Sequence, residues 1–160
     1  MKQRLSTFFL ALLMGLSLSA CGGNDTFYPA TVTTSDGSST ETLTVTEDGY
    51  YNSQEEVALY LSLYDHLPDN YVTKQEAQRQ GWTGGSVEPY TGEGTAIGGD
   101  RFGNYEGLLP EEAGRQYQEC DIDTVGTSSR GAKRIVFSND GLIYYTEDHY
   151  ESFQLLSGEP

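Results

Sequence analysis

A hairpin signal near the C-terminus constrains the fold of this chain most. Two apolar runs, 134–138 and 142–146, flank an Asn-Asp-Gly turn at 139–141. A short Asn- or Asp-Gly link between apolar runs predicts an antiparallel β-hairpin. Residues 115–123 alternate between polar and apolar side chains, which predicts a further strand, and residues 152–156 could close the sheet.

Helical patterns precede these strands. Capping boxes at 53–56 and 73–76 predict two helices, and the second helix is expected to stop at Gly81. Residues 82–99 are Gly-rich and expected to be irregular. Helices followed by consecutive strands predict an α+β domain over residues 50–160, with N-terminal helices packed on a C-terminal antiparallel β-sheet.

The first residues indicate export. Lys2 and Arg4 precede an apolar run that is too short to span a bilayer, so residues 1–20 are interpreted as a removed signal peptide. The run ends in Leu-Ser-Ala-Cys, which resembles a bacterial lipoprotein signal with Cys21 as the lipidated residue. An ordinary signal peptide with a chance cysteine is the alternative. The protein is therefore expected to be exported and either lipid-anchored on the outer side of the cell membrane or released.

The next segment, 21–49, is rich in Ser and Thr and has no Lys or Arg. Such a composition lacks the apolar surface for a core and predicts a flexible tether. Residues 43–46 alternate, and a short strand there is the alternative.

The charge of the chain argues against general nucleic-acid binding. It carries 24 acidic residues against nine Lys and Arg, a formal charge of −15. A polyanion is repelled by such a surface unless cations are concentrated locally. Arg130, Lys133 and Arg134 form such a concentration and are the clearest candidate anion site.

Two further residues suggest chemistry. Glu119 lies on the more polar face of its predicted strand, and His149 follows the end of another. Taken alone, Glu119 is better explained as a solvated strand residue and His149 as a structural or surface histidine. A general base, a general acid and clustered cations together are what cleavage of RNA at its own 2′-hydroxyl requires. Neither Cys nor His shows zinc-site spacing, and no metal site or cofactor is expected.

Several motifs occur in an order and spacing that is similar to a known family. They include 67–78, Gly81-Trp82, 97–100, Asn104, 106–107, 109–110 and 148–150. From about Tyr50 to Leu155 the chain resembles the barnase-like family of small secreted bacterial guanyl-preferring ribonucleases.

This resemblance implies a metal-independent endoribonuclease that acts on single-stranded RNA, with guanosine preferred. Glu119 would be the general base and His149 the general acid. The products would be a 2′,3′-cyclic phosphate and then, slowly, its hydrolysis product. The cations that match the family's phosphate-binding positions are Lys74, Arg130 and Arg134.

The resemblance also implies a guanine-recognition loop over residues 102–107. Glu106 would accept hydrogen bonds from the guanine N1 and N2 edge, and Tyr105 replaces an Arg that relatives carry. The residues expected to bind substrate are Phe102, Asn104, Tyr105, Glu106 and Tyr150. Asp100 and Asp121 are interpreted as hydrogen-bonding anchors rather than catalytic acids.

Partners follow from the same comparison. We expect single-stranded RNA, the membrane through Cys21, a possible barstar-like protein inhibitor, and a monomeric state. The alternative function is a catalytically weak barnase-like binding module on the cell surface, and a purely structural lipoprotein is a third reading. The presence of Glu119, His149 and all three cations together favours the enzyme.

Overall fold

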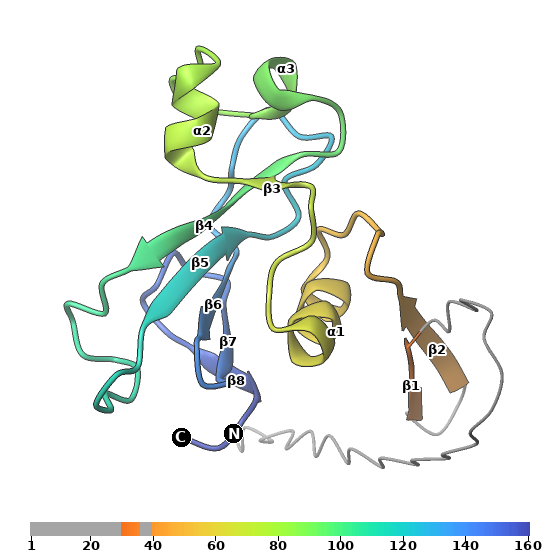
Figure 1. Ribbon diagram of the computed structural model, residues 1–160, viewed down its shortest axis with the longest axis vertical. Coiled ribbons are helices and arrows are strands. Elements are labelled where there is room, and N and C mark those ends of the chain that lie inside the picture. Colours follow the sequence, from red (N-terminus) through yellow and green to blue (C-terminus); the bar gives the residue numbers. More distant parts are fainter. Residues whose placement is uncertain (1–29, 36–39) are drawn as a thin grey trace, which may run out of the picture.

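A six-stranded sheet forms the centre of the computed structural model, which describes residues 30–35 and 40–160 (Figure 1). The predicted signal peptide and Cys21 lie outside these residues. Neighbouring strands follow one another in chain order: β3 (Tyr71–Val72), β4 (Ala96–Phe102), β5 (Tyr117–Asp121), β6 (Arg134–Ser138), β7 (Ile143–Thr146) and β8 (Gln154–Ser157).

The sequence predicts an antiparallel sheet, whereas the observed sheet is mixed. β3 pairs with β4 in parallel, and every later pair is antiparallel. The predicted hairpin is present as β6 and β7, with Phe137 opposite Ile143.

β4 corrects the expectation that residues 82–99 are irregular throughout. Its glycines hid a strand because they break the alternation of side chains. A Cβ at Gly98 would stand 2.6 Å from the Tyr71 ring and 2.7 Å from Cys120 Cβ, so only glycine permits this close packing.

The helices begin at their predicted caps. Ser53 precedes α1 (Gln54–Tyr64), and Thr73 with Glu76 forms a complete capping box at α2 (Lys74–Arg79). α2 gives way to Gly81, whose φ of +96° suits glycine. A short α3 (Glu88–Thr91) lies in the segment expected to be irregular. No helix in the described part is long and apolar enough to cross a membrane.

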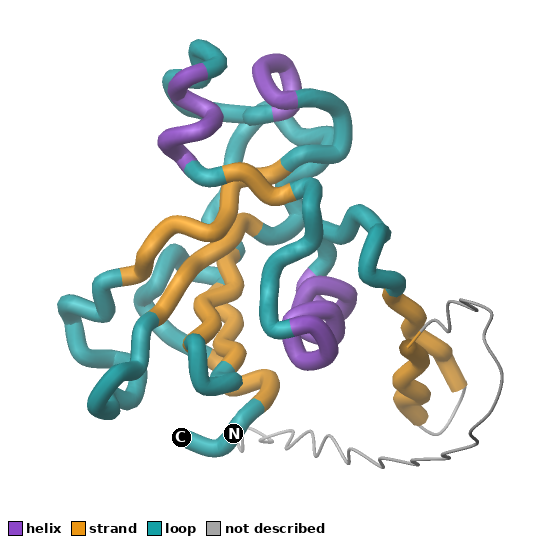
Figure 2. The backbone as a smooth tube through the Cα atoms, viewed as in Figure 1, coloured by secondary structure: helices purple, strands orange, loops and turns teal. Residues whose placement is uncertain are grey.

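The two faces of the sheet have different coverings. On one face, Val57 and Leu61 of α1 pack against Ile135 and Ile143, among others, in the largest core cluster. The opposite face carries a second cluster, and a third cluster joins α2 and Val87, the residue before α3, to β4. α2 and α3 lie together at one end of the sheet (Figure 2). The site-bearing side chains of β5 therefore face away from α1.

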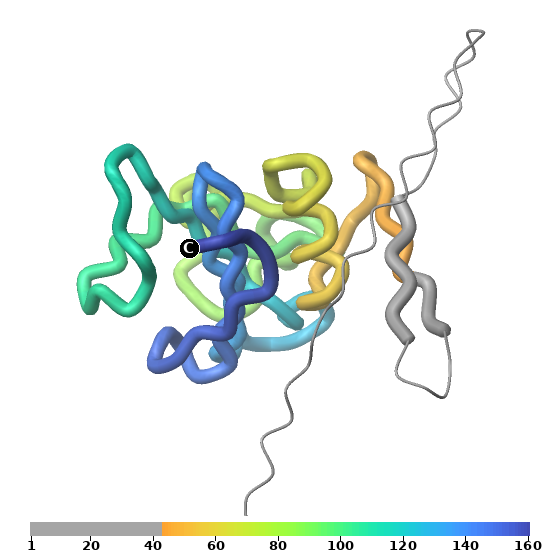
Figure 3. The backbone as a smooth tube through the Cα atoms, turned by 90° about the horizontal axis from the view of Figure 1, so that it is seen from below, coloured from red at the N-terminus to blue at the C-terminus, as the bar shows by residue number. Residues whose placement is uncertain are grey.

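Regular structure also occurs within the segment expected to be a tether. β1 (Ala30–Ser35) and β2 (Thr40–Val45) form an antiparallel hairpin. The end of β2 contacts α1, and Figure 3 shows the chain running on from there in orange and yellow into this helix. Val45 is fully buried, and Tyr60 Oη donates to the Glu47 carbonyl at 2.7 Å. The alternating residues at 43–46 thus belong to a strand, which ends at Val45. The domain boundary at residue 50 stays a prediction.

Candidate active site

Glu119 on β5 is the centre of a group of polar side chains on the sheet face opposite α1. Only 7% of the residue is exposed, and both carboxylate oxygens have a partner. Lys74 Nζ lies 2.5 Å from Oε1, and Tyr150 Oη donates to Oε2. Three residues from different parts of the chain, each predicted to belong to the site, therefore meet in direct contact.

Lys74 reaches this group because of where α2 begins. It is the first residue of that helix, and its backbone N–H donates to Asp100 Oδ2 at 2.9 Å. A carboxylate is favourable at this end of a helix, where backbone N–H groups lack partners. Asp100 thus acts as the predicted anchor and fixes the base of the Lys74 side chain.

Asp121 joins two further cations two residues along β5. Arg130 makes a bidentate contact with its carboxylate, at 2.7 and 2.8 Å, and Arg134 Nε lies 2.9 Å from Oδ1. The hydrogen bonds from Arg130 to Asp121 raise the pKa of that guanidinium, so it stays charged. Asp121 is an anchor, as expected, and Lys133 instead pairs with Asp123 at the surface.

Arg130 and Arg134 differ in how far their guanidinium groups are exposed to solvent. Arg134 is 2% exposed, and its Nη1 and Nη2 atoms donate to the backbone carbonyls of Arg130, Gly131 and Lys133. The Arg130 side chain is 24% exposed and that of Lys74 is 37% exposed. Lys74 and Arg130 thus present cationic groups to solvent, and Arg134 fixes the loop that carries Arg130.

His149 is exposed on the loop that follows β7. His149 and Tyr150 have φ values of +59° and +74°, a left-handed conformation that costs free energy in non-glycine residues. Asp148 holds this loop by accepting hydrogen bonds from Thr146 Oγ1 and from the backbone and hydroxyl of Ser152. These bonds, with those from Ser152 the strongest, lower the pKa of Asp148 to about 2.

Tyr150 connects the histidine to the carboxylate and to the recognition loop. Its ring centroid lies 4.8 Å from that of His149 and 5.3 Å from that of Phe102. Burial, and then the bond to Glu119, raise the pKa of Tyr150, so its hydroxyl remains a donor to the carboxylate.

The predicted recognition loop is closed by Asn104. Its side chain donates to the Leu109 carbonyl at 2.9 Å and accepts from the Leu109 N–H at 3.0 Å. The Asn104 amide is therefore used within the loop, and Tyr105 and Glu106 are exposed, Tyr105 to 95%. The structure does not bring these two residues into contact with Glu119.

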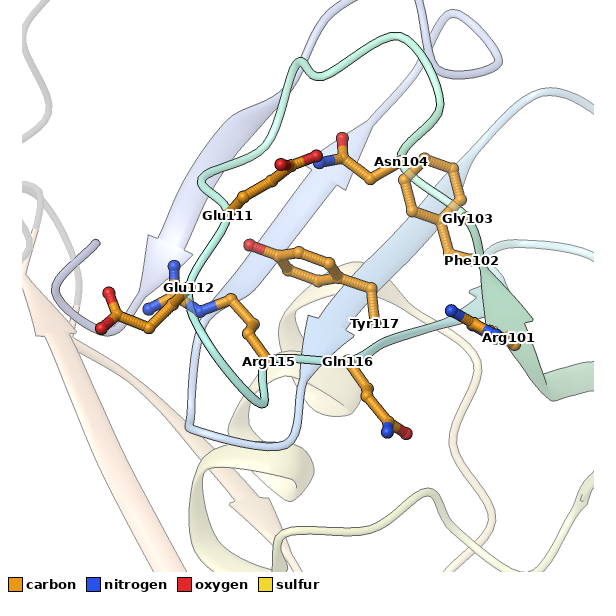
Figure 4. Close-up of a pocket in the computed structure, with 9 residues that line it drawn as sticks. All are labelled: Arg101, Phe102, Gly103, Asn104, Glu111, Glu112, Arg115, Gln116 and Tyr117. Atoms are coloured by element: carbon orange, nitrogen blue, oxygen red, sulfur yellow. The ribbon is translucent and has the colours of Figure 1, made fainter.

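A hollow of about 240 Å³ lies behind this loop (Figure 4). Phe102, Asn104 and Tyr117 are among the residues that line it, and Glu119 is not. Arg115 at its edge pairs with Asp140 at 2.8 Å and donates to the Pro110 carbonyl. These contacts tie the segment after the loop to the β6–β7 turn.

Among the described residues, no group of three His, Cys, Asp or Glu side chains is placed to hold a metal ion. What the site offers chemically is a carboxylate, an imidazole and two accessible cations.

Two contributors to the site were not predicted. Trp82 lies with its ring 5.7 Å from the Arg130 guanidinium carbon, and Asp148 organises the histidine loop. Asp148 precedes Ser152 by four residues, a local pattern that could have suggested the loop. No local signal connects Trp82 with Arg130, since they are far apart in the sequence.

Comparison with known proteins places the chain among nucleases. The protein-family model described as ribonuclease matches residues 54–157. A ribonuclease of Bacillus pumilus is 38% identical over 161 residues, which cover 96% of this chain and 98% of the relative. A ribonuclease of Heyndrickxia coagulans is 47% identical over 105 residues, or 64% of this chain and 94% of the relative. The guanyl-specific ribonuclease St of Saccharopolyspora erythraea is 44% identical over 71 residues, or 44% of this chain and 65% of the relative.

Proposed function

The chain belongs to the ribonuclease family, and we propose that it is a guanyl-preferring endoribonuclease that cleaves single-stranded RNA without a metal ion. The observation that carries this proposal is the contact of Glu119 with Lys74 and Tyr150, beside the Asp121-bound Arg130. This arrangement supports the proposal, because a carboxylate next to cations suits proton abstraction beside a phosphodiester.

In the first step Glu119 accepts the proton of the ribose 2′-hydroxyl, and the 2′-oxygen attacks the adjacent phosphorus. The bond from phosphorus to the 5′-oxygen breaks, and His149 donates a proton to that oxygen. The product is a 2′,3′-cyclic phosphate with Glu119 protonated and His149 neutral. Lys74 and Arg130 stabilise the charge that develops on the phosphoryl oxygens.

In the second step the roles of the two groups are reversed. His149 accepts a proton from water, which attacks the cyclic phosphate, and Glu119 returns its proton to the departing 2′-oxygen. Both groups regain their starting states. This step is the slower one, so the cyclic phosphate accumulates before the 3′-phosphate appears.

Before substrate binds, both oxygens of Glu119 are engaged. Each oxygen keeps a second lone pair that can accept from the 2′-hydroxyl, and the more mobile of the two contacts can shift when the phosphate of the substrate arrives. Lys74 is the more exposed partner and has a flexible stem, so it is the group that turns from Glu119 toward the incoming phosphate.

Guanine recognition is assigned to residues 102–107. The Asn104 side chain is engaged with Leu109, which leaves backbone amides and the Glu106 carboxylate to meet the base. The guanyl-specific relative from Saccharopolyspora erythraea supports this preference. Tyr105 supplies an exposed ring where relatives carry an Arg.

We further propose export and attachment to the membrane through lipidated Cys21, a monomeric state, and inhibition by a barstar-like protein. Such an inhibitor would fill the phosphate site around Arg130. Loss of a cation at Tyr105 would weaken its electrostatic attraction.

Initial cleavage rates of GpU, ApU, CpU and UpU by the full mature chain test the proposal. GpU is expected to be cleaved fastest, with equal rates in the presence and absence of a chelator. Equal rates on all four dinucleotides would contradict the guanine preference. No cleavage between about pH 5 and 8 would favour the catalytically weak binding module instead.

A further inference from the structure

The indole ring of Trp82 lies against the guanidinium of Arg130. The Arg130 guanidinium carbon is 5.7 Å from the Trp82 ring centroid, within the range of a cation–π interaction. Trp82 is 6% exposed and packs with Ala77, Val87 and Ile97 in the cluster between α2 and β4. Its ring is therefore a fixed surface against which the arginine rests.

A second route connects the same tryptophan to the arginine loop. Trp82 Nε1 donates to the Gly85 carbonyl at 3.1 Å, and the next residue, Ser86, donates from its backbone to Ser128 at 3.2 Å. Ser128 lies two residues before Arg130. The contact with the ring face and this backbone hydrogen bond both restrict the position of the guanidinium.

Asp121 alone leaves the guanidinium incompletely fixed. It binds one edge, through Nε and Nη2, and the same Oδ1 oxygen also lies 2.9 Å from Arg134 Nε, which makes no hydrogen bond to it. A planar group held at one edge can still tilt about that edge. Contact with an aromatic face restricts this tilt and so fixes the plane in which the third nitrogen, Nη1, lies.

We propose that Trp82 is a positioning residue for phosphate binding, which holds Arg130 at the scissile phosphate through the face of its indole ring. This inference rests on the proposed function, because it concerns the same phosphate site. The ring also packs with Ala77 of α2, the helix whose first residue is Lys74.

Binding of guanosine 3′-monophosphate and of guanosine, measured by calorimetry on the full mature chain, separates phosphate from base contacts. Trp82→Leu should raise the Kd for guanosine 3′-monophosphate by about three- to tenfold and change the Kd for guanosine by less than about twofold. Trp82→Phe keeps an aromatic face and should recover most of the loss. Val57→Ala, a cavity in the cluster under α1, is the matched control and should change neither affinity.

A double-mutant cycle makes the result specific. In an Arg130→Gln background, Trp82→Leu should have no further effect on nucleotide binding. An equal loss for guanosine and its monophosphate, or an undiminished effect in the Arg130→Gln background, would overturn the proposal. If Trp82→Leu does not fold, the same comparisons are made with Trp82→Phe, for which a smaller loss with the same pattern is expected.

The Arg130 Hε resonance gives a readout that does not require activity. Its ring-current shift should be present in the wild type and lost in Trp82→Leu, and an unchanged resonance would contradict the contact. A wild type that shows this shift but cleaves no dinucleotide would remove the proposed function and leave the contact standing.

Discussion

Lys74 and Arg79 lie in the same short helix, and only one of them reaches the site. Lys74 Nζ contacts Glu119, whereas Arg79 is exposed near the other end of α2 and forms no ion pair within the described residues. The difference between them comes from position on the helix rather than from charge. This makes the pair a test of local placement.

Lys74→Met is expected to lower kcat/KM on GpU by roughly 10²-fold, because in the proposed mechanism it removes a charge that stabilises the transition state. Arg79→Met removes the same charge from the same helix and should change kcat/KM by less than about threefold. Steady-state kinetics at fixed ionic strength measure both. Equal losses would mean that net charge, not position, determines the rate.

Asp148 should make the histidine loop sensitive to acid. Its pKa is lowered to about 2, below the value near 3.9 of an unfolded chain. Its contribution to stability is therefore complete above about pH 4 and is lost as pH falls toward 2. Asp148→Asn should reduce the free energy of unfolding at pH 7, with a difference from wild type that shrinks between pH 4 and 2.

Denaturant unfolding at several pH values measures this difference. Glu151→Gln, at an exposed position on the same loop, is the control and should show a difference that does not change over this range. A difference for Asp148→Asn that stays constant from pH 7 to pH 2 would contradict the assignment.

At the scale of elements, the segment before α1 belongs to the packed structure more than its composition suggested. Val45 at the end of β2 is fully buried, and Thr46 N–H donates to Tyr51 Oη at 2.8 Å. The end of β2 is therefore held by the burial of Val45, and the next two residues are held by hydrogen bonds with Tyr51 and Tyr60.

Val45→Ala is expected to lower the free energy of unfolding by roughly 1–3 kcal/mol, since it removes two buried methyl groups. Thr44→Ala at the adjacent exposed position should change it by less than about 0.5 kcal/mol. Urea denaturation of the full mature chain measures both. Equal effects would show that this segment is a tether.

The sequence predicted those elements whose signals are local. The caps at Ser53 and Thr73 located α1 and α2, and the turn at 139–141 located the β6–β7 hairpin. β4 was not predicted, because its glycines are needed for close packing against Tyr71 and Cys120, and the sequence alone does not show that these residues meet.

The site divides in the same way. Glu119, His149 and the cluster at 130–134 were candidates from the sequence itself, whereas Lys74 and the role of each residue came from resemblance to a family, because their meeting depends on contacts between distant segments. The division of Asp121 between two arginines and the contact of Trp82 with Arg130 were not predicted, since no spacing along the chain encodes them.

At the scale of the whole molecule, the acidity of the chain opposes its own substrate. Residues 50–160 hold seven Lys and Arg against 19 Asp and Glu, a formal charge of −12. Five of these seven cations pair with carboxylates of the same chain: Lys74, Arg115, Arg130, Lys133 and Arg134. RNA is repelled at long range and attracted only close to the site.

Added salt should therefore first help and then hinder association. From very low ionic strength, modest salt screens the long-range repulsion and should raise the association rate with long RNA. Higher salt should then weaken the phosphate contacts and lower the rate. Stopped-flow association over a salt series measures this, and a rate that falls steadily from the lowest salt would show that the local cations dominate at all distances.

The most direct test of the mechanism is product analysis of GpU cleavage by ³¹P NMR in the presence of a chelator. The wild type should accumulate guanosine 2′,3′-cyclic phosphate before the 3′-phosphate. Glu119→Gln and His149→Gln should each slow its formation by about 10²- to 10⁴-fold. Direct formation of a linear phosphate, loss of activity with chelator, or an unchanged rate in either variant would contradict the proposed mechanism.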